Sequence, residues 1–396
     1  MGKISAPSAT RAATQWTATG SSTNPDARSA GAEVASAALS GDDAKLLVVF
    51  SSEAYDLPGL LAGIHEVAGE VPVIGCTTAG EIAAAGPGSA GVVAMAIGGS
   101  GFDVRTASAN AEVGLREASA EVAMSAARLE SSPHRVLLVL TDGLGGDQQE
   151  VVRGAYSVLG AQVPLVGGCA GDGLKMKSTS QFYGQRVLKN SVVAAAIGSQ
   201  GPIGIGVEHG WRAVGDPMVV TASEGNRVLA LDDQPALSAY LKRLGAPPAV
   251  HDDADAFTHF AMTHPLGLSR RGGDEVRFVA GADFADGSLN CIAAVPQGSM
   301  VRIMEGDSRS VLEATNVACE NALSSLGGRA PLGVLAFDCI ARKGVLGDEG
   351  IVAEVERISN YASGAPVAGF YTYGEFARTH GLNGFHNQTL VVVAFA

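Results

Sequence analysis

The chain has 396 residues, of which 46% are hydrophobic and 17% are charged, and its formal net charge is −13. This composition is typical of a folded protein with well-buried cores and excludes a disordered chain. The negative charge and the lack of any Lys/Arg run argue against nucleic acid or an anionic membrane surface as a partner, because both require a basic footprint.

The lack of recognisable targeting signals and the pattern of cysteines indicate a cytoplasmic protein. No apolar run reaches the ~18 residues that a membrane-spanning helix needs, and the start of the chain lacks an apolar signal core. The five cysteines are odd in number and irregularly spaced, which is not the pattern of a disulfide framework. We therefore expect a cytoplasmic location, no membrane association, and thiols that are reduced and unpaired.

In chain order, residues 1–24 are rich in Ser, Thr and Ala and are predicted to be disordered. Apolar periodicity and helix caps then predict a first unit of helices and strands. Its elements are a helix from about 24 to 39, a strand at 46–50, a helix at 57–70, and strands at 71–75 and 91–97.

Two further units of the same kind follow. The second has a helix at 112–130, a strand at 136–140, a helix after Asp147, and strands at 163–167 and 191–197; the third has a helix at 310–326, a strand at 333–337, a helix at 348–361 and a closing strand at 389–395. Between them the pattern indicates β-rich structure, a helix at 232–244, a Pro- and Asp-rich linker or loop at 245–255, and more strands at 275–304.

A glycine-rich motif ending on a carboxylate occurs once in each unit. The copies are Pro72-Val-Ile-Gly-Cys-Thr-Thr-Ala-Gly-Glu81, Pro164-Leu-Val-Gly-Gly-Cys-Ala-Gly-Asp172 and Pro366-Val-Ala-Gly-Phe-Tyr-Thr-Tyr-Gly-Glu375. Such a repeat predicts an α/β fold with mixed sheets built from repeated α-β-α-β-β units. The two strands separated by a helix should pair in parallel, and the closing strand antiparallel. We expect the three motifs to occupy equivalent positions at the ends of strands.

Several stretches resemble the FIST family. The ending from Gly369 to Glu375, followed by 383–392, is similar to its C-terminal domain, whereas 72–81 and 206–235 are similar to its N-terminal domain. The stretch 337–342 resembles the family's Cys-x-x-Arg loop, with Ala341 in place of an expected glycine. The resemblance implies a FIST N-like domain at 25–232 and a FIST C-like domain at 233–396. It also implies a sensory module that binds small ligands such as amino acids and acts beside signalling proteins such as a histidine kinase or a cyclase.

The motif carboxylates Glu81, Asp172 and Glu375 suit the ammonium group of an amino acid, because ligands bind at the carboxyl ends of strands in open α/β sheets. Backbone N–H groups of the glycine turns, beside Cys76 and Thr77 in the first one, would hold a carboxylate. The alternative is structural: each Gly–Glu pair closes a tight turn, and the buried cysteines only fill space.

Polar residues are densest near the C-terminus, where we predict the ligand pocket. Its expected members are Cys339, Arg342, Tyr371, Tyr373, Glu375, His386, Asn387 and Thr389. Arg342 could bind a carboxylate with two parallel hydrogen bonds, so replacing it by Ala should abolish ligand binding and leave the fold largely intact. The alternative for His386, Asn387 and Thr389 is a local hydrogen-bonded turn.

Three functional interpretations stay open. The first is a ligand-binding sensor without catalysis or a cofactor. The second is a haem-containing nitric oxide sensor, as the resemblance also implies, with His209 or His386 as the axial ligand. The third is an enzyme with Cys339 as nucleophile and His386 as base. No metal site is expected, because the His-rich stretch 251–264 reads as a solvated acidic loop.

Overall fold

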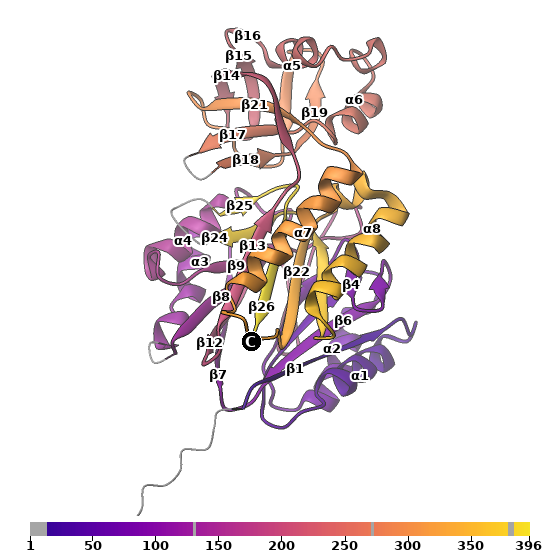
Figure 1. Ribbon diagram of the computed structural model, residues 1–396, viewed down its shortest axis with the longest axis vertical. Coiled ribbons are helices and arrows are strands. Elements are labelled where there is room, and N and C mark those ends of the chain that lie inside the picture. The colour runs from indigo at the N-terminus through magenta and orange to yellow at the C-terminus, as the bar shows by residue number, and fades with distance from the viewer. Residues whose placement is uncertain (1–13, 130–131, 271–272, 379–383) are drawn as a thin grey trace, which may run out of the picture.

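The computed structural model describes residues 14–129, 132–270, 273–378 and 384–396. Three units of similar construction form the larger body in Figure 1, and a β-rich insert lies above them. Each unit has the order strand, helix, strand, helix, strand, hairpin, strand. This confirms the predicted α/β architecture and adds a leading strand and a small hairpin to each unit.

The bounds of the elements show the correspondence. Unit one comprises β1 (Trp16–Ser22), α1 (Ala27–Ala38), β2 (Ala44–Ser51), α2 (Leu57–Ala68), β3 (Val73–Thr77), the hairpin β4 (Glu81–Ala83) and β5 (Gly86–Pro87), and β6 (Val92–Gly98). Unit two comprises β7 (Phe102–Asn110), α3 (Leu115–Ala123), a 3-10 turn (Ala126–Leu129), β8 (His134–Thr141), α4 (Gln149–Leu159), β9 (Leu165–Cys169), the hairpin β10 (Gln181–Tyr183) and β11 (Arg186–Leu188), and β12 (Ser191–Ser199). Unit three comprises β13 (Ile203–Glu208), α7 (Ser308–Ser324), β22 (Gly333–Cys339), α8 (Ile340–Ala362), β23 (Val367–Thr372), the hairpin β24 (Glu375–Arg378) and β25 (Phe385–His386), and β26 (Leu390–Phe395).

The insert occupies the chain between β13 and α7. It contains β14 (Arg212–Glu224), β15 (Arg227–Leu231), β16 (Gln234–Pro235), α5 (Ala236–Leu244), a 3-10 turn (Pro248–Val250), α6 (Ala254–Ala261), β17 (Leu266–Arg270), β18 (Gly273–Arg277), β19 (Val279–Asp283), β20 (Ser288–Cys291) and β21 (Met300–Glu305). Its eight strands form one sheet, and its apolar core is separate from the cores of the three units. The stretch 245–255, expected as a linker or loop, lies inside this insert and carries the 3-10 turn and the start of α6.

The central strands of the units pair as predicted. β2 pairs with β3, β8 with β9, and β22 with β23, all in parallel. The closing strands β6, β12 and β26 pair antiparallel with β2, β8 and β22. The three glycine motifs therefore begin on equivalent strands of the three sheets and turn at the carboxyl ends of these strands, which confirms the expected repeat.

The hairpin after each motif leaves its own unit and joins the sheet of another. β4 of unit one pairs with β23 of unit three, β24 of unit three pairs with β9 of unit two, and β10 of unit two pairs with β3 of unit one. The exchange forms a closed cycle. No unit has a complete sheet without a strand from a neighbour.

The inner faces of the three sheets meet in one apolar core. Alternate residues of the central strands point into it, and the intervening ones pack against the outer helices. Phe50 of unit one lies 4.7 Å from Phe370 and 6.0 Å from Phe337 of unit three, measured between ring centres. The strands are apolar on both faces because both are covered.

Two sequence-based expectations need correction. Residues 16–22 are not disordered: they form β1, which pairs along its length with β6, whereas residues 1–13 lie outside the described part. The stretch from Cys339 to Arg342 is not a loop, because α8 begins at Ile340. Among the described helices, none is long and apolar enough to cross a membrane.

The motif glycine of each unit permits close contact with the neighbouring parallel strand. A Cβ at Gly75, Gly167 or Gly369 would overlap the carbonyl oxygen of Val49, Val139 or Ala336 respectively. Since backbone atoms of a central strand cannot move aside, a methyl group there forces the sheet apart.

We therefore predict that Gly369→Ala lowers the unfolding free energy by about 1–3 kcal/mol or more. Urea denaturation followed by circular dichroism measures the change. Gly281→Ala is the control, because a Cβ there meets nothing within 4 Å. Equal midpoints for the two variants would contradict this packing.

Candidate functional site

The three motif turns meet and hydrogen-bond to one another through their backbones. The bonds are Ala79 N to Tyr371 O (2.9 Å), Tyr371 N to Gly80 O (2.8 Å), Gly171 N to Thr77 O (2.9 Å), Cys169 N to Gly374 O (2.8 Å) and Tyr373 N to Cys169 O (3.1 Å). Each unit thus contacts both others. The glycines allow this approach, and Gly80 and Gly374 have φ of 128° and 147°.

A buried polar side chain with the same two kinds of partner begins each exchanged hairpin. Glu81 accepts hydrogen bonds from the Thr78 hydroxyl (2.6 Å) and from Gly91 N (3.0 Å). Glu375 accepts from the Thr372 hydroxyl and from Thr389 N (3.3 Å). Each carboxylate therefore ties its motif turn to the segment that leads into the closing strand.

In unit two this position belongs to Gln181, not to Asp172. Gln181 lies opposite Cys76 in the pairing of β10 with β3, as Glu81 lies opposite Phe370 and Glu375 opposite Gly168. Its amide oxygen accepts from Ser191 N (3.2 Å). The equivalence expected for Asp172 is therefore corrected.

The reason is an insertion in the second motif. Six positions separate Gly75 from Glu81, whereas fourteen separate Gly167 from Gln181, so unit two contains eight additional residues. Asp172 holds this added loop, because its carboxylate accepts from the backbone N–H groups of Met176 (2.9 Å), Lys177 (2.7 Å) and Ser178 (2.9 Å).

Glu375 is fully buried, and burial raises its pKa to about 8 although hydrogen bonds from Thr372, Thr389 and Cys339 oppose the shift. Burial, and secondarily the charge of Glu375, raises the pKa of the Cys339 thiol well above its usual value. A thiol that keeps its proton is a poor nucleophile. This environment therefore does not favour the enzyme interpretation.

We predict that Glu375→Gln removes a pH-dependent part of the stability. The folded state retains the Glu375 proton up to about pH 8, whereas an unfolded glutamate releases it near 4.5. The stabilisation from the protonated form is complete below pH 4.5 and is lost as the pH rises to 8. Glutamine should fit, since Gln181 has the same role.

Chemical denaturation from pH 5 to 9 measures the effect. The difference in unfolding free energy between variant and wild type should grow in favour of the variant with rising pH, by roughly 1 kcal/mol or more for each pKa unit of the shift. A difference that does not change with pH would show that Glu375 is already ionised in the folded state.

Arg342 lies in a second buried cluster, on the other side of β22. Its guanidinium donates to Asp338 (2.6 Å), Glu354 (2.6 Å) and the backbone oxygen of His209 (3.0 Å). Arg342, Asp338 and Glu354 have no exposed surface. Burial acts to lower the pKa of Arg342, but the charges of the two acidic residues raise it. Burial and Glu354 raise the pKa of Asp338.

This pairing corrects the expectation that Arg342→Ala leaves the fold largely intact. The variant leaves Asp338 and Glu354 buried without a cation, which should cost about 3–5 kcal/mol. Arg357→Ala on the same helix is the control, because Arg357 is partly exposed. It lies 3.9 Å from Glu313 and donates to Leu312 O (2.8 Å), contacts that together should be worth about 1–2 kcal/mol. Similar denaturation midpoints for the two variants would contradict the assignment.

The remaining predicted site residues are close to these clusters. Cys339 N donates to Thr389 O (3.2 Å), so the strand end, the motif turn and the segment before β26 are adjacent as expected. His386 is partly buried and contacts Ala377 O (3.0 Å) through Nε2. Cys76 is fully buried, and the Thr77 hydroxyl accepts from Ser180 N (2.9 Å). All five cysteines are free, as predicted.

Eleven of the twelve predicted site residues are buried, and only His386 is partly exposed. Asn383, part of the same sequence pattern, lies outside the described residues. A direct ligand role for these side chains stays a prediction. What the structure adds is that most of them have protein partners.

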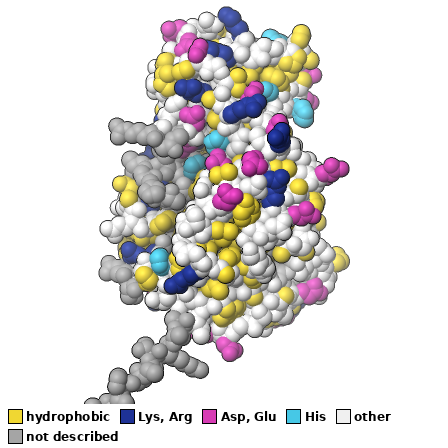
Figure 2. All heavy atoms as spheres, viewed as in Figure 1, with side chains coloured by type: hydrophobic (Ala, Val, Ile, Leu, Met, Phe, Trp, Pro, Cys, Tyr) yellow, Lys and Arg dark blue, Asp and Glu magenta, His cyan; other side chains and the backbone are white. Residues whose placement is uncertain are grey.

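A hollow of about 650 Å³ lies where α7 begins, next to the connection from β13 to β14; we call it the α7 hollow. Its charged lining residues are Glu208, Arg212, Asp307, Arg309 and Glu313. Figure 2 shows charged side chains of both signs on this face of the molecule. Trp211 also lines it, and its indole N–H donates to Gln388 O (3.0 Å).

The buried cluster around Arg342 is bonded to the two backbone segments that line this hollow. Arg342 binds the backbone oxygens of His209 and, at 3.4 Å, Val311. These residues directly adjoin Gly210 and Ser310 in the lining. The buried charges therefore fix the position of the two segments that form the hollow.

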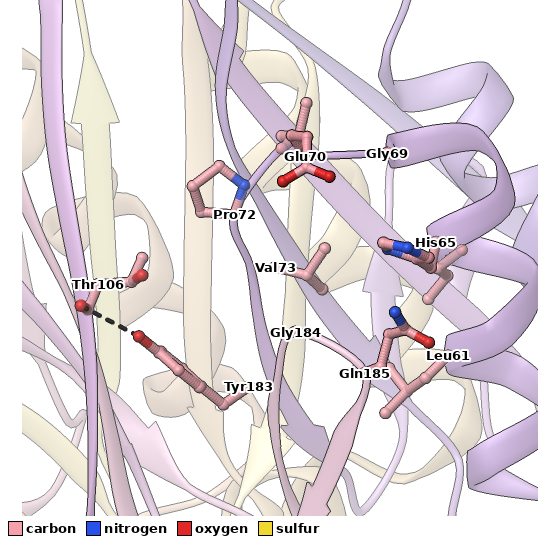
Figure 3. A pocket seen from close by; sticks show the side chains of 12 residues that line it. Leu61, His65, Gly69, Glu70, Pro72, Val73, Thr106, Tyr183, Gly184 and Gln185 are labelled. Carbon is pink, nitrogen blue, oxygen red and sulfur yellow. Dashed lines mark hydrogen bonds between the residues drawn. The ribbon is translucent and has the colours of Figure 1, made fainter.

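A smaller hollow of about 240 Å³ lies at the amino end of β3, away from the motif turns (Figure 3). His65, Glu70 and Gln185 line it, and the Tyr183 hydroxyl donates to Thr106 O (3.3 Å) at its edge. None of the twelve predicted site residues lines it.

Comparison with protein families identifies the chain. The FIST N domain matches residues 45–234, and the FIST C domain matches residues 236–378. The chain belongs to the FIST family. The two matches meet inside the β-rich insert. The boundary between the FIST N and FIST C domains therefore does not coincide with a boundary between the three structural units, whose sheets exchange strands.

Individual relatives are more distant. An uncharacterized protein of Mycobacterium tuberculosis (strain ATCC 25618 / H37Rv) is 25% identical over 241 residues, 58% of this chain and 60% of the relative. One from Mycobacterium bovis (strain ATCC BAA-935 / AF2122/97) is 26% identical over 240 residues, with the same shares. The match thus spans less than two thirds of these proteins. A chorismatase crystal structure aligns over 98% of this chain and 99% of its own at 11% identity, but the TM-score of 0.38 is too low to support a conclusion.

The haem interpretation finds little support in this FIST protein. Burial lowers the pKa of His209 and of His386, which suits a metal ligand. However, His209 Nδ1 accepts from Trp211 N (3.0 Å), and five charged residues line the hollow beside it. A haem requires an apolar slot, and these residues do not provide one.

Sequence reasoning missed three partners of Arg342: Asp338, Glu354 and Thr315, whose hydroxyl accepts from the guanidinium (3.2 Å). Asp338 could have been found, because it precedes Arg342 by four residues at the end of an apolar strand. Glu354 lies twelve positions further along α8, beyond the break in this helix at Gly347, and Thr315 lies on α7, so nothing close to Arg342 in the sequence marks them.

Proposed function

We propose that this FIST protein is a small-ligand-binding sensory protein in bacterial signal transduction, and that its ligand is an amino acid or a small carboxylate. The family assignment supports a sensory role. The observation that carries the proposal is the α7 hollow, which combines side chains of both charges over a floor fixed by Arg342.

The lining suits a zwitterion. Arg212 already forms two hydrogen bonds to Glu305 (2.9 and 2.6 Å), whereas Arg309 has no ion pair with the described residues and is exposed. Arg309 can therefore bind a carboxylate as a charge-assisted pair. Glu208 and Glu313 can accept an ammonium group, and Trp211 supplies an apolar wall.

In this proposal the predicted site residues act mainly as supports. Arg342 positions the floor of the hollow, and Gln388, next to Asn387 and Thr389, binds the Trp211 indole. Ligand contacts across α7 would bias the position of this helix against β13 and α8. A partner such as a histidine kinase or a cyclase would respond to that change.

We predict that Arg309→Ala weakens the binding of amino acids and small carboxylates at least tenfold, a loss of about 1.4 kcal/mol or more. Glu208→Gln should weaken only ligands with an ammonium group. A thermal-shift screen with amino acids and dicarboxylates, followed by calorimetry of the hits, measures both effects. Arg329→Ala is the control, because Arg329 is exposed beyond the other end of α7.

A ligand that binds wild type, Arg309→Ala and Glu208→Gln with equal affinity would place the site elsewhere. The absence of any binding amino acid or carboxylate would contradict the proposed ligand class.

A further inference from the structure

The loop inserted in unit two displays large apolar side chains to solvent. Leu174 is 62% exposed and Met176 is 54% exposed. Both have a left-handed backbone, with φ of 65° and 52°, a conformation that is costly for residues other than glycine. The loop therefore carries two strained positions whose side chains contribute little burial.

Buried groups enforce this arrangement. Asp172, which is 2% exposed, accepts three backbone N–H groups of the loop and the Tyr373 hydroxyl (2.6 Å). The same hydroxyl accepts from Leu174 N (2.8 Å). The strain is thus maintained by side chains of two different units. Strained positions persist where the surroundings fix them, and they concentrate at functional sites.

Lysine residues also gather in and shortly after the loop. Three of the seven lysines, Lys175, Lys177 and Lys189, lie within 15 positions of each other, although the net charge is −13. Lys175 pairs with Glu53 (2.6 Å), and Lys189 donates to the Ser178 hydroxyl (2.6 Å). Lys177 is exposed and has no ion pair with the described residues.

We propose that the loop 172–178 is a docking surface for an acidic segment of a partner protein, one that presents carboxylates around an apolar contact. Leu174 and Met176 would supply the apolar contact, and Lys177 with its basic neighbours would bind the carboxylates. The proposal rests on the proposed sensory function in that it names the surface that meets the signalling partner.

The position of the loop suits a transmitted signal. Tyr373 holds the loop, and Tyr371 on the same motif turn lies directly opposite Asp338 of the buried cluster in the pairing of β22 with β23. That cluster fixes the floor of the α7 hollow. A change in the hollow can therefore reach the loop through one rigid turn.

An anionic membrane is the other surface that binds apolar and basic side chains. The overall charge of −13 opposes it, because the rest of the surface is repelled. It is kept as an outcome of the test.

The test uses the full chain without ligand and a fluorescent helical peptide in which Glu residues flank a Leu stripe. A matched peptide has Gln in place of Glu. Fluorescence anisotropy should show at least tenfold tighter binding of the Glu peptide, weakened by salt. Lys175→Glu/Lys177→Glu should reduce this binding at least tenfold, and Lys242→Glu, an exposed change in the insert, should not.

A second variant separates docking from folding. Leu174→Gly/Met176→Gly relieves the backbone strain, so the melting temperature should be unchanged or higher while peptide binding falls at least tenfold. A lower melting temperature would show that the two side chains are structural and would overturn the proposal. Equal binding of both peptides would overturn it as well.

Vesicles of phosphatidylglycerol and phosphatidylcholine complete the experiment. Co-sedimentation with vesicles that depends on Leu174 and Met176, without peptide binding, would show that the loop binds a membrane and would overturn the proposed protein partner. Binding to neither the peptide nor the vesicles would overturn the proposal that the loop is a docking surface. Amino-acid binding by the loop variants is measured separately. Its retention shows that a failure of docking does not bear on the α7 hollow.

Discussion

The fold depends on the cyclic exchange of hairpins among three units. Each sheet is completed by a hairpin from a neighbour, and the turns that lead into these hairpins hydrogen-bond to one another. Because the cycle is closed, no unit can leave without exposing the sheet edge of one neighbour and leaving the hairpin of the other unpaired. The close packing of glycine turns, the inner apolar core and the burial of polar groups all follow from this arrangement.

The exchange of hairpins also explains why polar side chains are buried where the three motif turns meet. A turn that crosses between units cannot satisfy all its backbone groups within its own sheet, so side chains complete the network. Glu81, Gln181 and Glu375 do so in the three units. Carboxylates in such positions are structural first. Functional contacts are more readily made where the buried network reaches the surface, at the α7 hollow and at the loop held by Asp172.

Periodicity and the repeated motif were sufficient to predict the three units and the parallel and antiparallel pairs, and the number and spacing of the cysteines predicted that they are free. They could not predict the hairpin exchange, because β4, β10 and β24 are short and pair with strands up to 289 positions away in sequence. The carboxylate of Asp172 was misplaced because it ends the motif in sequence, whereas the eight-residue insertion moves the equivalent position to Gln181. Arg342 was expected to bind a ligand carboxylate, but its guanidinium is bonded to groups of β22, α7 and α8. Residues 16–22 lack strong apolar character, so the sequence alone does not predict β1, which forms by pairing with β6.

The central claim is that the three units fold only together, although the FIST N and FIST C matches divide the sequence in two. Expressing residues 1–234 and 235–396 as separate chains tests it directly. Each fragment alone should lack a cooperative thermal transition and near-ultraviolet circular dichroism, because each contains a sheet that lacks a hairpin from the other. Co-expression should restore both signals in a one-to-one complex. A fragment of residues 1–234 that unfolds cooperatively by itself, with native near-ultraviolet circular dichroism, would contradict the account.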